Sequence, residues 1–237
     1  MTVKMKSFCT FLAATVILMT ACSDYEDPGP VQKAEKSYAL IDFDRLEMGS
    51  AFHIEVTQGN NFGIDVRGDR RNISDLVVYK RGSTLIIEYD ENESRKHDTY
   101  INITMPALKS IHFSGASESK VSGFESEGDL DLYLSGASVS QLDAGYGRVN
   151  AVVSGASNLR MSGLGDELDV ELSGASILSA FDYPVREAIL NVSGASNGKL
   201  TVSDDLDVVA SGASAVLYRG NPTVTSETSG SSTVSRD

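Results

Sequence analysis

The sequence predicts an all-β protein, a β-helix-like solenoid with rungs of about 20 residues. The first observation is the motif Ser-Gly-Ala-Ser, which occurs six times, at 114–117, 135–138, 154–157, 173–176, 193–196 and 211–214, with the variant Ser-Gly-Ser-Ser at 229–232. The second is the spacing of the motif glycines, which follow one another every 18 to 21 residues. The third is the alternation of apolar and polar residues that leads into the motif, as in Leu130–Leu134 and Leu168–Leu172. A short repeat that cannot bury its own apolar face is typical of a solenoid, in which each rung packs on the next.

The first 21 residues have the features of a signal peptide. Lys4 and Lys6 precede an almost wholly apolar stretch, 8–19, that is too short for a comfortable membrane span. The stretch ends in Leu18-Met19-Thr20-Ala21-Cys22, which resembles a bacterial lipobox. We therefore expect Cys22 to be lipidated and to become the mature N-terminus. The simpler alternative is an ordinary secretory signal cleaved near Ala21.

Residues 22–36 are expected to form an acidic linker. Ser23–Pro30 contains three acids and ends in Pro-Gly-Pro, and an acidic run directly after the lipidated cysteine resembles the surface-export signal of lipoproteins from Gram-negative gut anaerobes. We accordingly expect a lipid-anchored protein of the outer membrane that faces the cell surface. The alternative is a solvated linker with no signal in it.

A single β-solenoid domain is expected over 37–237, and its first part, 37–109, is irregular. Phe52–Val56 and Phe62–Val66 alternate on either side of Gly59-Asn60-Asn61, which predicts a hairpin. Leu76–Tyr79 and Leu85–Tyr89 predict a second hairpin, and Tyr100–Met105 a further strand before Pro106. One helical turn fits between Asp69 and Asp75.

The second part, 110–237, holds the regular rungs. Each rung is expected to run through a strand, a tight corner at Ser-Gly-Ala-Ser, a shorter strand and a loose polar corner. Leu159–Met161 and Leu200–Val202 are examples of the shorter strand, and Gly145-Tyr146-Gly147 is an example of the loose corner.

Geometry explains the repeated motif better than catalysis does. Glycine supplies a backbone angle that other residues avoid, alanine is small enough to stack, and serine can bond nearby backbone groups. The predicted structural turn residues are Ser114, Gly115, Ser135, Gly136, Ser154, Gly155, Ser173, Gly174, Ser193, Gly194, Ser211, Gly212, Ser229 and Gly230. A nucleophilic serine would need a base, and the three histidines, His53, His97 and His112, precede the first motif. The order Ser-Gly-Ala-Ser also differs from the Gly-x-Ser-x-Gly elbow of hydrolases.

Charge and composition narrow the possible partners. The net charge is −13, and loss of 1–21 with its two lysines leaves −15, so a nucleic-acid partner is not expected. The mature chain has no cysteine besides Cys22, and neither the histidines nor the acids show metal-ligand spacing, so no metal site and no cofactor are predicted. Arg67-Gly68-Asp69 spells the tripeptide that integrins bind, which we attribute to chance.

The domain resembles the family of putative auto-transporter adhesins with a head GIN domain. The resemblance rests on Phe52–Gly59, Leu85–Ile87, Thr104–Leu108 and Ile111–Ser117, followed by the serial corners. It implies a right-handed β-helix-like solenoid from a secreted or surface protein, and it implies no catalytic residue.

Three functions remain open at this point. We expect a non-enzymatic cell-surface lipoprotein that binds a protein or glycan ligand as an adhesin. The alternative is a structural or assembly protein of the envelope, which would self-associate through the Ser/Thr-rich C-terminal rung, 223–235. A polysaccharide-active enzyme is the least favoured, because basic residues in the repeats are sparse and do not recur beside clustered acids.

Overall fold

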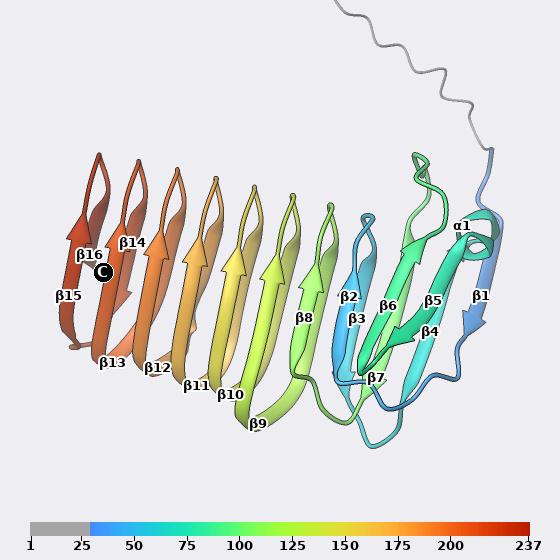
Figure 1. Ribbon diagram of the computed structural model, residues 1–237, viewed down its shortest axis with the longest axis horizontal. Coiled ribbons are helices and arrows are strands. Elements are labelled where there is room, and N and C mark those ends of the chain that lie inside the picture. Colours follow the sequence, from blue (N-terminus) through green and yellow to red (C-terminus); the bar gives the residue numbers. More distant parts are fainter. Residues whose placement is uncertain (1–28) are drawn as a thin grey trace, which may run out of the picture. The chain divides into compact units, whose positions relative to one another are not determined.

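The computed structural model describes residues 29–237, of which Val31–Asp237 form one compact unit (Figure 1). Strands hold 66% of the residues and helix 2%, in a β-solenoid of about seven turns with rungs of about 19 residues, so the predicted fold class is confirmed. The expected signal peptide, Cys22 and the first part of the linker lie outside the described residues. One cluster of buried side chains runs through the whole unit, so Val31–Asp237 carries the core it needs to fold by itself.

Five long strands form the regular body of the unit. They are β9 (Glu118–Leu134), β10 (Val139–Val153), β11 (Asn158–Leu172), β12 (Ile177–Val192) and β13 (Asn197–Ala210). Each pairs in parallel with the next, one rung further along the chain. The corners between them line up along one edge of the stack (Figure 1).

The loose corner expected in each rung is not a separate corner. Each long strand continues through that region and bends at bulges, so that Val139–Val153 includes Gly145-Tyr146-Gly147 without a break. Close stacking explains the glycines, because a Cβ on Gly147 would lie 2.2 Å from the carbonyl oxygen of Glu127. Tyr146 is buried at the bend. Tyr183, two rungs further along the chain, is also buried, and its burial raises the pKa of its hydroxyl to about 12.

Every rung therefore has two faces, which we name by their place relative to the corner. The post-corner face consists of 118–122, 139–143, 158–162, 177–180 and 197–201. The pre-corner face consists of 130–134, 149–153, 168–172, 188–192 and 206–210. Alternate side chains of both faces point into the common core, and the others point outward.

The N-terminal part extends both faces and then closes the stack. Its elements are β1 (Lys33–Ser37), β2 (Arg45–Met48), β3 (His53–Gln58), β4 (Gly63–Asp69), α1 (Arg70–Ser74), β5 (Leu76–Arg81), β6 (Thr84–Tyr89), β7 (Thr99–Met105) and β8 (Ser110–Phe113). The post-corner face continues in the order β9-β3-β7-β4-β1, and the pre-corner face in the order β9-β8-β2-β6-β5. The expected hairpin of β5 and β6 and the expected helical turn, α1, are present.

The hairpin expected from Phe52–Val56 and Phe62–Val66 is wrong. These segments form β3 and β4, but β7 lies between them and pairs in parallel with β3 and antiparallel with β4. Ile101 and Ile103 of β7 are fully buried in this position, so the inserted strand completes the core.

The domain also begins earlier than residue 37. Residues 33–36, which the expected linker 22–36 includes, belong with Ser37 to the strand β1 (Lys33–Ser37), and this strand pairs antiparallel with β4 in full register. An edge strand with one face in water needs little apolar content, which explains why its sequence resembles a linker.

Three short strands form the last rung and a half: β14 (Ala215–Arg219), β15 (Thr223–Thr228) and β16 (Thr233–Arg236). β15 pairs with β13 and β16 pairs with β14, and neither has a second neighbour among the described residues. Among residues 29–237, the last rung therefore has an unpaired sheet edge.

Candidate functional site

The Ser-Gly-Ala-Ser motifs form the tight corners between the two faces. Their glycines have φ between 71° and 78°, which is left-handed backbone. The third residue of each corner, from Ala137 to Ser231, donates its N–H to the glycine carbonyl of the preceding corner at 2.7–2.8 Å. The corners thus continue the hydrogen-bond ladder of the strands.

The corner serines bond the backbone. The fourth serine is buried in every Ser-Gly-Ala-Ser corner. In five corners its hydroxyl donates to the carbonyl of the first serine at 2.7–2.9 Å, as from Ser138 to Ser135. In two others it accepts from a backbone N–H of the preceding corner, as Ser157 does from Ser138 at 3.3 Å. Backbone bonding accounts for the repeated serines.

One corner was not predicted from the sequence. Met48 pairs with Phe113, so Gly49–Phe52 lies directly beside the first motif. Ser50 and Ala51 have φ of 67° and 58°, and Phe52 fills the buried position that serine holds elsewhere. The only sequence signal is a Gly-Ser-Ala in place of Ser-Gly-Ala, flanked by two alternating strands.

A row of polar side chains crosses the post-corner face where the strand order departs from the chain order. The register aligns Glu35 of β1, Arg67 of β4, Tyr100 of β7, His53 of β3 and Glu118 of β9. The Arg67 guanidinium lies 4.4 Å from the centre of the Tyr100 ring, and the His53 ring stacks on the other side of it at 4.8 Å. His53 Nδ1 is 3.3 Å from the Glu118 carboxylate. The predicted hairpin of β3 and β4 leaves no place for Tyr100 between His53 and Arg67, so the row could not be predicted from the sequence.

This row borders a groove of about 580 Å³, which we call the N-terminal groove. Its polar lining includes three cationic side chains from separate segments, Lys33 of β1, Arg67 of β4 and Lys96 in the loop before β7, against the carboxylates of Glu35 and Asp98. The lining thus has one more cationic than anionic side chain, on a chain whose net charge is −13. Guanidinium and ammonium groups that converge from three segments favour an anionic group of a ligand.

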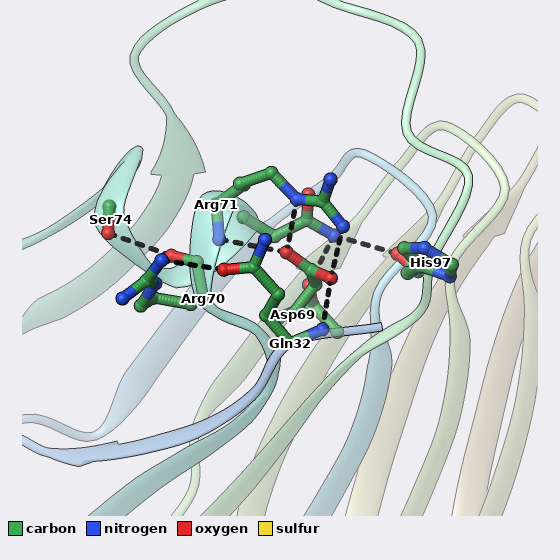
Figure 2. A network of polar contacts seen from close by, with 8 residues as sticks. Gln32, Asp69, Arg70, Arg71, Ser74 and His97 are labelled. Atoms are coloured by element: carbon green, nitrogen blue, oxygen red, sulfur yellow. Dashed lines mark hydrogen bonds and ion pairs between the residues drawn. The ribbon is translucent and has the colours of Figure 1, made fainter. Parts of the chain in front are cut away.

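A buried polar network holds the segments beside the groove in place (Figure 2). Asp69 is 1% exposed and accepts from the Arg71 side chain at 2.7 Å, from the Arg71 backbone N–H and from the Gln32 backbone N–H. Asn72 of α1 donates to the carbonyl of His97 at 2.7 Å. The Arg71 hydrogen bonds hold the pKa of Asp69 well below its usual range. The network ties β1, α1 and the loop before β7 into one wall.

The same network determines whether the Arg67-Gly68-Asp69 tripeptide can bind a partner through both of its charged side chains. Arg67 is exposed in the groove, but the Asp69 carboxylate is buried and fully engaged. The tripeptide cannot present both charges to a partner.

Within residues 29–237, no three His, Cys, Asp or Glu side chains are grouped so that they could hold a metal ion. No helix in this part of the chain is long and apolar enough to cross a membrane.

Residues 29–237 thus form a β-solenoid with two exposed faces and a groove whose lining includes three cationic side chains. The chain belongs to the family described as putative auto-transporter adhesin, head GIN domain, whose model matches residues 42–222. No curated protein matches the chain.

Solved structures share the fold at low sequence identity. A putative adhesin from Parabacteroides merdae is 16% identical, with 87% of this chain and 96% of that chain covered and a TM-score of 0.73. A putative adhesin from Bacteroides fragilis is 17% identical, with 86% and 96% covered and a TM-score of 0.75. A putative lipid binding protein from Parabacteroides distasonis is 16% identical, with 86% and 96% covered and a TM-score of 0.70.

Proposed function

We propose that this protein is a non-enzymatic, lipid-anchored adhesin of the outer membrane surface that binds an acidic glycan in the N-terminal groove. Membership of the adhesin family supports the adhesive role. The convergence of Lys33, Arg67 and Lys96 on one groove carries the choice of ligand, because carboxylate or sulfate groups of a sugar chain match these cations. The corner serines support a role without catalysis, because their hydroxyls bond the backbone.

Glycan binding is tested by titrating the chain from residue 29 with uronic-acid, sulfated and neutral oligosaccharides of equal length. Acidic oligosaccharides should bind and neutral ones should not. Arg67→Ala should weaken binding at least about tenfold, because a charge-assisted hydrogen bond contributes about 1.5–3 kcal/mol. Arg236→Ala, which removes the same charge in the last strand, is the matched control and should bind like the wild type. Equal affinity of the Arg67 variant, or a preference for acidic peptides over glycans, would refute the glycan assignment.

Anchoring and orientation are tested in the cell. Incorporation of a labelled fatty acid should depend on Cys22 and disappear in Cys22→Ala, while a protease added to intact cells should remove the wild-type protein. Protection from that protease would place the domain in the periplasm and contradict a surface adhesin.

The open C-terminal rung favours a second candidate, an assembly protein of the envelope. β15 and β16 each have an unpaired edge that carries few charges, and such edges can pair with another strand. Lysines introduced by Thr225→Lys and Ser235→Lys should abolish self-association that uses this edge. Unchanged association in the double variant would exclude the edge as the contact.

A further inference from the structure

A row of positive charges runs along the post-corner face at every second rung. Register places Lys120, Gln141, Arg160, Ser179 and Lys199 side by side on β9 to β13. All three cationic side chains are exposed. Because neighbouring strands lie about 4.8 Å apart, the cations repeat about every 9.6 Å.

The pre-corner face, on the other side of the core, carries the complementary row. Asp131, Asn150, Asp169, Ile189 and Asp207 are aligned on the same five strands. The carboxylates fall on β9, β11 and β13, which are the strands that carry the three cations. The two rows thus have the same period of two rungs.

These six charges have no ion-pair partner among residues 29–237, whereas other charges of the repeats do. Arg148 pairs with Glu167, Arg186 with Asp166 at 2.9 Å, and Arg219 with Asp237 at 2.6 Å. Asp131 accepts a hydrogen bond from the Asn150 side chain at 3.0 Å, but its charge, like the other five, is not neutralised by an ion pair.

Apolar side chains accompany both rows. Val139 and Ile177 are 41% and 39% exposed on the post-corner face, and Ile189 and Val209 are 49% and 50% exposed on the pre-corner face. Burial of such side chains between two faces would add a contribution that salt does not screen.

We propose that copies of this chain stack side by side, with the post-corner face of one copy on the pre-corner face of the next. Because the two rows have the same period, one register of this contact brings Lys120 opposite Asp131, Arg160 opposite Asp169 and Lys199 opposite Asp207 of the neighbouring copy. A slip by one rung would place the cations opposite Asn150 and Ile189, so the rows also fix the register. The contact joins two different faces, and it can therefore repeat from copy to copy in one direction.

Analytical ultracentrifugation of the chain from residue 29 tests this stacking. The wild type should self-associate with rising concentration at about 20 mM salt, and about 500 mM salt should weaken the association at least tenfold, because exposed charges are screened. Lys120→Gln, Arg160→Gln and Lys199→Gln together should abolish it. The control Asn60→Asp, Asn61→Asp and Asn92→Asp makes the same change of net charge in exposed loops and should associate like the wild type.

A charge swap gives the decisive comparison. One variant replaces the three cations by Glu, so that both faces are acidic, and the other replaces the three aspartates by Lys, so that both faces are basic. Each alone should stay monomeric, and an equimolar mixture should associate. A monomeric wild type at low salt, equal loss in the loop control, or a mixture that stays monomeric would overturn the proposal. Association that survives both high salt and the triple Gln variant would assign the contact to the open C-terminal edge instead.

Discussion

Glycine at the second corner position meets two separate demands. The backbone there is left-handed, and the glycine of the preceding rung lies almost in contact: a Cβ on Gly155 would sit 2.4 Å from the carbonyl oxygen of Gly136. Gly82, in the turn between β5 and β6, meets only the first demand, because its φ is 63° and nothing lies within 4 Å of a Cβ. Comparing substitutions of Gly155 and Gly82 therefore distinguishes the cost of left-handed backbone from the cost of a clash between stacked corners.

We expect Gly155→Ala to destabilise the protein by about 3 kcal/mol and Gly82→Ala by about 1 kcal/mol. Left-handed backbone costs a residue with a Cβ about 1–2 kcal/mol, and only Gly155→Ala adds a clash with backbone atoms that cannot move independently. Urea unfolding followed by circular dichroism measures both. Equal losses would mean that the corners do not depend on close stacking.

In the corner Gly49–Phe52, the reverse substitution, alanine to glycine, should stabilise the protein. Ala51 has a φ of 58°, whereas Ala116, at the matching place in the next corner, is not among the residues with positive φ. Ala51→Gly should stabilise the protein by about 1 kcal/mol, because it relieves the left-handed strain. Ala116→Gly should destabilise it by about 0.5–1 kcal/mol, because glycine there only adds freedom to the unfolded chain. Thermal unfolding decides the signs, and a lower melting temperature for Ala51→Gly would contradict the account.

At the scale of elements, the sequence supports the regular rungs more fully than the N-terminal part. From Ser110 onward, alternation, the corner glycines and a fixed period all indicate the same structure. Because each rung has the same surroundings as the rung before it, these local signals suffice to predict its strands and its tight corner. β3 and β4 alternate equally well, but their partner β7 comes more than 30 residues later, and alternation does not say which strand lies beside which. The N-terminal groove depends on that strand order, so it could not be assembled from the sequence.

The Asp69 network should control how the N-terminal end responds to acid. The folded pKa of Asp69 is lowered, so its ionised form contributes stability above the unfolded pKa, about 3.9, and that stability is lost as the pH falls below it. Asp69→Asn should cost about 2 kcal/mol at pH 7, because it removes the charged pair with Arg71 and leaves polar groups short of partners. The stability gap to the wild type should narrow from pH 5 towards pH 2.

Asp65→Asn on the same strand is the control for this change. Asp65 is exposed, so its loss should alter stability by less than about 0.5 kcal/mol. Urea unfolding at a series of pH values measures all three proteins. Parallel pH curves for the wild type and Asp69→Asn would show that the buried carboxylate does not contribute to acid sensitivity.

At the scale of the whole molecule, a solenoid is stabilised by contacts between neighbouring rungs, so its interior and its open end should differ even where local geometry is the same. The Ala175 N–H donates to Gly155 at 2.7 Å, and the Ser231 N–H donates to Gly212 at the same distance. Neighbouring rungs cover the Ala175 corner on both sides, whereas the Ser231 corner belongs to the last rung. If cooperation between rungs governs opening, Ser231 should exchange its amide hydrogen at least about 100-fold faster than Ala175.

Ala137 completes this comparison, because its N–H donates to Gly115 at 2.7 Å near the other end of the repeats, where β2 and β3 cover the preceding corner. It should be protected like Ala175. Hydrogen exchange followed by NMR or mass spectrometry, at a concentration where the protein is monomeric, measures all three sites. Similar protection of Ser231 would mean that each corner is held by its own hydrogen bond. Fast exchange at both Ser231 and Ala137 would mean that the N-terminal strands and α1 do not stabilise the end they close.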